Sequence, residues 1–218
     1  MTLAQDPDEL FDIVTVVGEA TGRRKRRGDV HRDGDWHRSI HIWVVGQQDG
    51  ADFLLLQRRS LAKDTAPGKL DPTVGGHLGA GETWQDGLRE ADEEIGLTVT
   101  EQDVVYAGTR RSIGAGEPGV SDQEIQDVFF VRNDAPLTEY QPNLAEIAGL
   151  VRITVDDALE LLSGNQHEAR VQTLDAATLR VRQGTITPAD FGVQLDRYVY
   201  RVAIAARRFL AGERHFSV

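Results

Sequence analysis

Residues 74–97 of the chain read VGGHLGAGETWQDGLREADEEIGL. The first eight of these residues include four glycines, so this part is expected to be a loop whose backbone takes conformations that other residues avoid. From Trp84 to Ile95 the pattern becomes helical, and Gly96 is a typical C-terminal stop. The segment therefore predicts a glycine-rich loop that leads directly into a short helix.

Three glutamates share one face of this predicted helix. Glu90, Glu93 and Glu94 are spaced i, i+3 and i+4, and like charges at that spacing cost an isolated helix roughly a few tenths of a kcal/mol per pair. A divalent cation would compensate, because magnesium prefers oxygen ligands and typically binds one or two carboxylates together with substrate phosphates. Glu82 either adds a carboxylate or anchors Arg89. The alternative interpretation is the solvated acidic face of a surface helix.

This pattern resembles the signature of the Nudix hydrolases, G-x5-E-x7-R-E-U-x-E-E-x-G-U, in which U is apolar. The positions that fill it are Gly76, Glu82, Arg89, Glu90, Ala91, Glu93, Glu94, Gly96 and Leu97. The resemblance implies that Glu90 and Glu94 bind the metal most directly. It also implies that Glu93 either completes the metal site or acts as the base on the attacking water. Arg89, Glu90 and Glu93 are the predicted catalytic residues.

The signature differs from the family pattern in one respect. Six residues separate Glu82 from Arg89, where the pattern has seven. A deletion near the start of the helix would shift Glu82 while leaving the spacing from Arg89 onward intact, so the role of Glu82 is left open. Gly87 marks the expected place of the adjustment, at a cost in helix propensity of up to about 1 kcal/mol.

The resemblance extends beyond this motif, over roughly residues 12–162. The matching stretches are Trp36-His37-Arg38, Gln57-Arg58-Arg59-Ser60, Lys63-Asp64 and Pro67-Gly68-Lys69-Leu70-Asp71. They look like the Nudix branch related to isopentenyl diphosphate isomerase, which implies an α/β fold of the Nudix type, an α/β/α sandwich around a mixed sheet. An isomerase of this branch is expected to carry a cysteine two residues before the histidine that matches His77. Position 75 is glycine and the chain has no cysteine, which weakens isomerisation as the function.

Further site residues are expected around this motif. The candidates for holding phosphate are Arg58, Arg59, Arg38 and Lys63, because arginine forks match phosphate geometry. Gly76 of the glycine-rich loop is a further predicted substrate-binding residue. Successive strand residues point to opposite sides, so Arg58 and Arg59 cannot both face the substrate.

Glu124 is predicted as a further metal ligand or base, with an edge-strand charge as the alternative. His77 is either a ligand, as the resemblance implies, or a residue that hydrogen-bonds the loop. Glu146 is expected to form an ion pair rather than to reach the site.

Two other groups of residues invite a functional interpretation. The histidines His31, His37 and His41 lie in unrelated local settings, so the sequence gives no argument for a zinc site. The basic run of residues 23–27 is expected to be a solvated hairpin arm, followed by a loop over residues 28–35. A nucleic-acid contact is the alternative for this run, but no aromatic residue is interleaved with it.

Composition limits the functional classes. There are 24 Lys+Arg against 35 Asp+Glu, a net charge of −11, which argues against a nucleic-acid polymer as partner. The chain starts without a recognisable secretory signal and has no apolar run of about 18 residues, so a cytoplasmic location without membrane insertion is expected. The absence of cysteine excludes disulfides and thiolate metal sites.

The organisation along the chain follows from the hydrophobic pattern. Strands are expected at residues 12–17, 40–45, 52–57, 104–107, 125–131 and 146–154, with a hairpin turn at residues 48–50 and a helix at 156–162. The predicted Nudix catalytic domain covers residues 1–165. Residues 166–218 are predicted to be an extension with a long amphipathic helix, 188–211, that opens at Thr187-Pro188.

The apolar stripe of that helix consists of Phe191, Leu195, Tyr198, Val202, Ala205 and Phe209. It is expected to pack on the domain, with a homodimer contact as the alternative.

The sequence thus predicts a Mg²⁺- or Mn²⁺-dependent hydrolase that cleaves a diphosphate bond in a nucleoside di- or triphosphate or a nucleotide-linked small molecule. An isopentenyl diphosphate isomerase-like enzyme and a non-catalytic nucleotide-binding module are the alternatives.

Overall fold

The structure is a computed structural model of the chain, and it describes residues 6, 8–63, 66–115, 121–192 and 196–218. Asp64 of the predicted substrate motif and Leu195 of the predicted apolar stripe lie outside the described residues.

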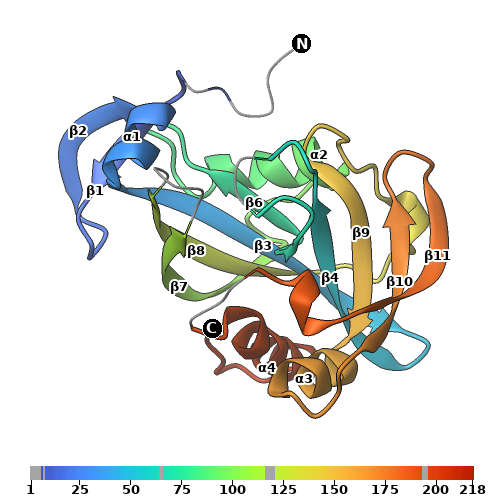
Figure 1. Ribbon diagram of the computed structural model, residues 1–218. Helices are drawn as coiled ribbons and strands as arrows, with labels where there is room; N and C mark the ends of the chain where they lie inside the picture. The colour runs from blue at the N-terminus through green and yellow to red at the C-terminus, as the bar shows by residue number, and fades with distance from the viewer. Residues whose placement is uncertain (1–5, 7, 64–65, 116–120, 193–195) are drawn as a thin grey trace.

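A mixed sheet forms the centre of the molecule (Figure 1). Its strand order is β11-β10-β9-β4-β3-β8-β7, with β5 paired to β4 and β6 paired to β3. Strand β3 pairs in parallel with β8 and antiparallel with β4 and β6. The strands are β1 (Leu10–Val14), β2 (Ala20–Arg26), β3 (Trp36–Gln48), β4 (Ala51–Arg59), β5 (Leu70–Asp71), β6 (Val74–His77), β7 (Val104–Ala115), β8 (Ser121–Arg132), β9 (Ile147–Thr154), β10 (Ala169–Asp175) and β11 (Arg180–Ile186). The helices are α1 (Arg27–Asp33), α2 (Arg89–Ile95), α3 (Val155–Ser163) and α4 (Tyr198–Leu210), with 3₁₀ helices η1 (Asp86–Leu88), η2 (Leu137–Glu139) and η3 (Pro188–Asp190).

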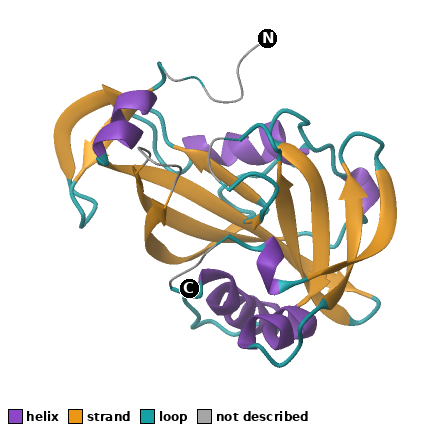
Figure 2. Ribbon diagram, in the orientation of Figure 1, coloured by secondary structure: helices purple, strands orange, loops and turns teal. Residues whose placement is uncertain are grey.

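Helices cover both faces of this sheet (Figure 2). Strand residues point alternately to the two faces, so Trp43 and Val45 of β3 pack in the core with α3 and α4, whereas Ile42 and Val44 pack in the core with α2. A strand covered on both faces reads as a nearly continuous apolar run, which is the pattern of residues 40–45. The predicted α/β/α sandwich around a mixed sheet is confirmed.

The turn between β3 and β4 lies where the sequence predicts it. Asp49 (φ 52°) and Gly50 (φ 81°) both have positive φ, as a two-residue hairpin turn of type I′ requires. This turn fixes the register in which β3 and β4 pair, from Val45 with Leu54 to Gln48 with Ala51.

The N-terminal residues form a hairpin and a helix at one end of the sheet (Figure 1). Residues 20–26, which include most of the basic run, form the largely exposed strand β2 paired with β1, as expected for a solvated hairpin arm. The predicted loop over residues 28–35 is wrong, because Arg27–Asp33 is the helix α1. Val30 of this helix packs with Phe11, and Gly34 ends it with φ 67°.

The C-terminal part differs from the prediction in two respects. Residues 169–186 form the hairpin β10–β11, which joins the main sheet through β9. The predicted helix 188–211 is wrong in its first half: η3 covers only Pro188–Asp190, closed by a capping box from Thr187 to Asp190, and α4 begins at Tyr198.

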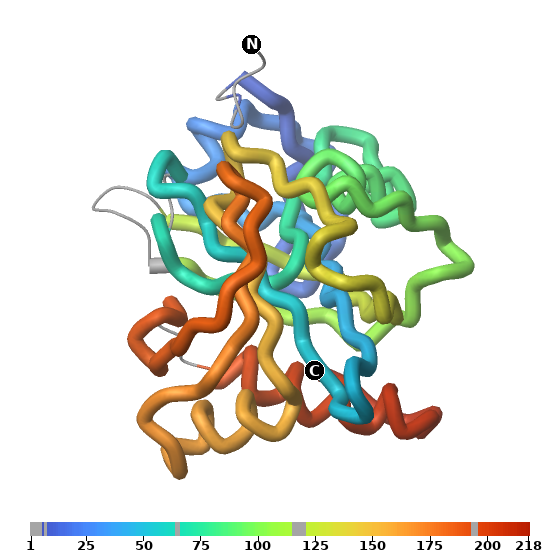
Figure 3. The backbone as a smooth tube through the Cα atoms, turned by 90° about the vertical axis from the view of Figure 1, so that its right-hand side faces the viewer, coloured from blue at the N-terminus to red at the C-terminus, as the bar shows by residue number. Residues whose placement is uncertain are grey.

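The packing of α4 follows the predicted apolar stripe. Tyr198, Val202 and Ala205 are buried in the core that α4 shares with α3, and Figure 3 shows the two helices side by side below the sheet. The division into a domain of residues 1–165 and an extension stays a prediction. Among the described residues no helix combines the length and the apolar composition needed to cross a membrane.

Candidate active site

A cavity of about 810 Å³ lies beside the glycine-rich loop and α2. Its acidic lining residues are Glu9, Asp71, Glu90, Asp122, Glu124, Glu146 and Asp196. Its basic lining residues are Arg27, Arg59, Lys63, Lys69, Arg110 and Arg111. Acidic side chains thus slightly outnumber basic ones, so a doubly or triply charged phosphate group needs a bound cation to be held there.

The helix that carries the glutamates is shorter than predicted. Residues 86–88 form the 3₁₀ helix η1, and α2 covers only Arg89–Ile95. A 3₁₀ turn is tighter than an α turn, and it lies where the signature lacks one residue. A Cβ at Gly87 would overlap Leu78, at 2.7 Å, so the close packing of this turn requires glycine. The tight turn therefore accommodates the missing residue and leaves the spacing from Arg89 onward unchanged.

The three glutamates of α2 lie in three different environments. Glu90 lines the cavity. Glu94 is buried (2% exposed) behind Gly75, whose backbone N–H donates to its Oε2 at 3.4 Å. The side chain of Glu93 is 59% exposed and points toward Arg89, at 3.7 Å. The part of Glu93 in the metal site stays a prediction, because the contact with Arg89 leaves its side chain mostly exposed.

Glycine 76 makes room for Glu90. A Cβ at this position would overlap the Glu90 carboxyl group, so no other residue allows the carboxylate to lie over the strand β6. Gly76 also lines the cavity, as expected of a substrate-binding position.

Arg89 and Glu82 act as supports for this arrangement. Arg89 lies 3.0 Å from Glu90 Oε1 and 3.5 Å from Glu82 Oε2. Glu82 also accepts a hydrogen bond from the Gly79 backbone N–H at 2.7 Å. Of the two roles considered for Glu82, the geometry matches the anchoring of Arg89 and the loop, and Arg89 in turn positions Glu90.

A third carboxylate accompanies Glu90 and Glu94. Glu146 lines the cavity and forms an ion pair with Lys63 at 2.7 Å, so it both reaches the site and is paired. Burial raises the pKa of Glu90 to about 7, and repulsion from Glu93 and Glu146 adds to this effect. Burial, Glu146 and Glu90 raise the pKa of Glu94 well above its usual value, against the lowering effect of Lys63.

These carboxylates fit a divalent cation. Glu90 and Glu146 line the cavity and Glu94 is buried behind Gly75. A bound dication would remove the repulsion that helps to raise the pKa of Glu90 and of Glu94. Oε1 of Gln57, whose amide donates to Glu94 at 3.2 Å, is buried and has no hydrogen-bond partner among the described residues. A hard cation such as Mg²⁺ suits such a set of oxygen donors.

A second group of candidate metal ligands lies along the same cavity. His31 of α1, His37 of β3, His77 of β6 and Asp122 of β8 bring one ligand atom each to within 4.8 Å of the others. The conclusion that the histidines are too scattered for a metal site is therefore wrong for His31 and His37. We call this group the histidine cluster.

The hydrogen bonds of the histidine cluster define its chemistry. His37 Nδ1 lies 3.1 Å from the Asp35 carbonyl, to which it must donate, so Nε2 keeps its lone pair 3.5 Å from Asp122. Arg27 donates to His77 Nδ1 at 3.0 Å, so His77 Nε2 carries the proton and lies 3.4 Å from Glu124. In this arrangement His37 is ready to bind a metal, whereas His77 first has to release Arg27.

Burial also controls the charge of these groups. It lowers the pKa of His37, and it lowers the pKa of His77 well below its usual value, so both rings are neutral near pH 7. Glu124, predicted as a ligand of the α2 metal, lies beside His77 instead, and burial raises its pKa to about 7. Neutral imidazoles with a carboxylate are ligands that suit zinc and similar transition metals.

Two predicted phosphate-binding arginines are engaged elsewhere. Arg58 donates to the Gly68 carbonyl and pairs with Asp190, both at 3.0 Å. Its neighbour Arg59 faces the cavity and pairs with Asp71, so of these two strand neighbours it is Arg59, rather than Arg58, that lines the site. Arg38 pairs with Asp127 at 3.1 Å, away from the cavity lining. Lys63 does line the cavity, as predicted.

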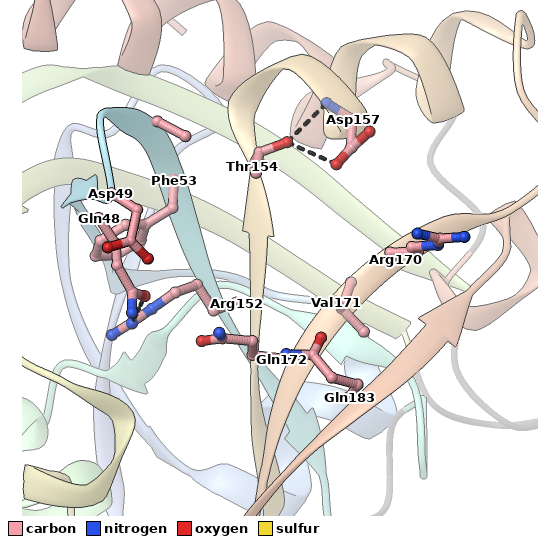
Figure 4. A pocket seen from close by; sticks show the side chains of 11 residues that line it. Gln48, Asp49, Phe53, Arg152, Thr154, Asp157, Arg170, Val171, Gln172 and Gln183 are labelled. Atoms are coloured by element: carbon pink, nitrogen blue, oxygen red, sulfur yellow. Dashed lines mark hydrogen bonds between the residues drawn. The ribbon is translucent and has the colours of Figure 1, made fainter.

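A smaller hollow of about 290 Å³ lies between the β3–β4 turn, β9 and β10 (Figure 4). Its polar groups bind one another: Arg152 donates to Gln48 and lies over the Phe53 ring, and the Thr154 hydroxyl caps α3 by accepting from Asp157. It contains no cluster of buried carboxylates among the residues that line it, so the larger cavity is the candidate active site.

Comparison with known proteins agrees with this assignment. The family model of the NUDIX domain matches residues 35–174. An uncharacterized Nudix hydrolase of Clostridium acetobutylicum is 32% identical over 156 residues, which cover 71% of this chain and 74% of that protein. Nudix hydrolase 3 of Arabidopsis thaliana is 32% identical over 161 residues, 72% of this chain but 20% of that protein.

Two further similarities complete the comparison. An isopentenyl-diphosphate Delta-isomerase of Streptomyces avermitilis is 28% identical over 179 residues, which cover 81% of this chain and 87% of that protein. The crystal structure of DR0079 from Deinococcus radiodurans superimposes with a TM-score of 0.51 at 25% identity, over 72% of this chain and 91% of that chain. The chain belongs to the Nudix family. Its enzymatic class is that of the Nudix hydrolases, which act on diphosphate bonds.

Proposed function

We propose that the chain is a divalent-metal-dependent hydrolase that cleaves the diphosphate bond of a nucleoside di- or triphosphate or of a nucleotide-linked small molecule. The observation that carries this proposal is the cavity of about 810 Å³ that Glu90 and Glu146 line, with Glu94 buried behind Gly75 at its wall. Burial raises the pKa of Glu90 and of Glu94, and carboxylates in such a place suit a site that binds a cation together with a substrate phosphate.

Glu90 and Glu94 are the proposed principal ligands of Mg²⁺ or Mn²⁺, with Glu146 beside them. When bound, such a cation lowers the pKa of a coordinated water and neutralises charge on the diphosphate oxygens. The role of Glu93 as ligand or base stays a prediction that its exposed position does not favour.

Basic residues of the cavity are proposed to bind the phosphates. Arg59 lines it and points from β4 toward Asp71, and Lys63 lines it beside Glu146. Both cations are held by carboxylates at the cavity wall, so they are already oriented when the substrate arrives. Arg89 is proposed to act on Glu90 rather than on the substrate, because it contacts Glu82 and Glu90.

Isomerisation of an isoprenoid diphosphate is the main alternative, favoured by the similarity to the Streptomyces avermitilis enzyme. The chain has no cysteine, and Gly75 stands where the resemblance implies one, so this chemistry lacks its expected acid. A binding module without catalysis is the other alternative, motivated by the shortened signature. The tight turn at residues 86–88 weakens that argument, because it accommodates the missing residue. A homodimer and a cytoplasmic location stay predictions from the sequence.

One experiment separates the three functions. The chain is incubated with Mg²⁺ or Mn²⁺ and a panel of nucleoside di- and triphosphates, ADP-ribose, sugar nucleotides and isopentenyl diphosphate, and the products are separated by chromatography. Metal-dependent cleavage of a diphosphate bond is expected. Formation of an isomer without cleavage would support the isomerase, and binding without turnover would support the module.

A further inference from the structure

Three hydrogen-bonded side chains close one end of the cavity. His41 Nδ1 lies 3.0 Å from the Tyr198 hydroxyl, and Trp43 Nε1 donates to the same hydroxyl at 3.0 Å. His41 and Tyr198 both line the cavity although they are only 8% and 1% exposed. His41 lies four residues beyond His37 on β3, about 13 Å along the strand, and two residues beyond Ser39, which pairs with His77.

The donors and acceptors of this group fix the protonation of His41. Trp43 Nε1 can only donate, so the Tyr198 oxygen accepts there. Among the described residues the Tyr198 hydroxyl contacts no other acceptor than His41 Nδ1, to which it therefore gives its proton. His41 must then carry its own proton on Nε2. Burial, together with Arg110 and Arg59, lowers the pKa of His41 to about 3, which keeps the ring neutral.

The Nε2 side of His41 faces a glycine. Gly75 of β6 pairs with His41 in the sheet and also lines the cavity. A Cβ at position 75 would lie 3.7 Å from Nε2 and 3.5 Å from the neighbouring ring carbon. Because glycine has no such atom, no side chain at position 75 separates this edge of the imidazole from the cavity that both residues line.

Residues outside the matched family domain hold this arrangement. Tyr198 begins α4, beyond residues 35–174, and its ring lies under the Arg110 guanidinium at 4.1 Å. Arg110 is itself fixed by Asp196 at 2.7 Å, which also lines the cavity. The C-terminal segment thus supplies part of the cavity wall through Asp196 and Tyr198.

We propose that His41 is a substrate-binding residue that donates a hydrogen bond from Nε2 to an oxygen of the group attached to the diphosphate. This inference rests on the proposed function. Glu90, Gly75 and His41 line one cavity, so a group attached to a diphosphate at Glu90 would reach His41 around the edge of β6 at Gly75. Because the proton of His41 stays on Nε2, this nitrogen can only donate a hydrogen bond. It therefore selects attached groups with acceptor oxygens, such as a ribose, a second phosphate or a base carbonyl. Plain alkyl diphosphates gain nothing from it.

Enzyme kinetics with the best substrate of the nucleotide panel tests the role of His41. His41→Leu removes the donor, and KM is expected to rise about tenfold while kcat changes less than twofold. His41→Gln keeps an N–H group in a similar place and is expected to restore most of the loss. Inhibition by inorganic diphosphate, which has no attached group, is expected to be unchanged in both variants. Equal KM values for His41→Leu and the unchanged protein overturn the inference.

Tyr198→Phe tests how the proton on Nε2 is fixed. It removes the hydroxyl that fixes the tautomer, so an intermediate rise in KM is expected. Tyr200→Phe, the same substitution two residues along α4 at a side chain that contacts Arg197 instead, is the matched control. In the unchanged protein, nitrogen-15 NMR of the histidine rings at pH 7 is expected to show His41 protonated on Nε2 only.

The two possible failures are distinguishable. A charged His41 ring, or a proton on Nδ1, overturns the inference even if the chain hydrolyses diphosphates. The nitrogen-15 NMR spectrum that shows this is recorded on the unchanged protein, so it does not depend on whether a variant folds. Absence of cleavage across the whole panel in the unchanged protein overturns the proposed function and removes the substrate role of His41 with it.

Discussion

Two groups of candidate metal ligands lie along one cavity, and they differ in chemistry and in how the sequence encodes them. Glu90 and Glu94 come from one turn of α2 and are buried carboxylates with raised pKa values. His31, His37 and His77 come from three separate elements and, where their pKa is shifted, are neutral. A cation would offset the repulsion that acts on the carboxylates of the first group. We therefore propose that the catalytic cation binds at α2 and that the histidine cluster is an accessory site.

Substitution of Glu94 by Gln is expected to have the largest effect. The change removes a negative ligand and should lower kcat/KM by roughly 10³-fold, a typical loss when a metal that stabilises the transition state is lost. The metal-free protein should unfold at the same or a higher temperature, because a buried charge with a strongly raised pKa is removed. Steady-state kinetics and calorimetry measure the two quantities.

Asp92→Asn is the matched control for that substitution. Asp92 lies on the same helix with an exposed side chain, so a change there should leave kcat/KM within about twofold. If both variants kept full activity, α2 would not carry the catalytic cation.

The histidine cluster should be the less sensitive of the two groups. His37→Gln removes the imidazole that is ready to bind a metal, and we expect a loss of only about tenfold in kcat/KM, because the proposed catalytic cation at α2 keeps its ligands. Cobalt bound to the unchanged protein should show the visible spectrum of nitrogen ligation, and this spectrum should vanish in the variant. His167→Gln, at an exposed histidine, is the control. A loss larger than that of Glu94→Gln would reverse the assignment of the two groups.

The pH dependence of magnesium binding should also distinguish them. The pKa of Glu90 is raised to about 7, so this carboxyl is protonated below pH 7 and must lose its proton when the cation binds. Magnesium affinity should therefore fall as the pH falls from 7 to 6, by up to about tenfold for each proton released. Calorimetric titration at pH 6, 7 and 8 measures it. The Glu90→Gln variant should release one proton fewer when magnesium binds. Equal magnesium affinity of the unchanged protein at pH 6, 7 and 8 would contradict the raised pKa of Glu90.

Glu93→Gln is expected to have the smallest effect. The Glu93 side chain is 59% exposed and lies 3.7 Å from Arg89, and such exposed ion pairs contribute little. We therefore expect kcat/KM to fall less than about threefold. The helix pattern alone predicts a loss as large as that of Glu94→Gln. Kinetics of the two variants side by side therefore tests whether burial or helical spacing better identifies the ligands.

Local pattern was sufficient for much of the fold. The alternation and apolar content of residues 40–45 predicted a strand covered on both faces, and Asp49-Gly50 predicted the hairpin turn that the structure confirms. The strand β11 was missed because most of its side chains are exposed and give no apolar alternation. The first half of the predicted C-terminal helix failed because Pro188–Asp190 closes as a capped 3₁₀ turn instead of continuing.

The site was predictable only where its residues are neighbours in the sequence. The positions of Glu90 and Glu94 follow from one helix, but the contact of His37 with His77 depends on the pairing of β3 with β6. Strand alternation predicts that only one of Arg58 and Arg59 faces the cavity, but it does not predict which one. The three-dimensional structure is needed to show that it is Arg59. The contact of His41 with Tyr198 joins residues 157 positions apart, and no local pattern indicates it.

Anomalous diffraction from crystals grown with Mn²⁺ and methylenediphosphonate would locate the catalytic cation. We expect a manganese peak within ligand distance of the Glu90 and Glu94 carboxylates, with phosphonate oxygens on the same ion. A peak only among His31, His37 and His77, or none at all, would contradict this expectation.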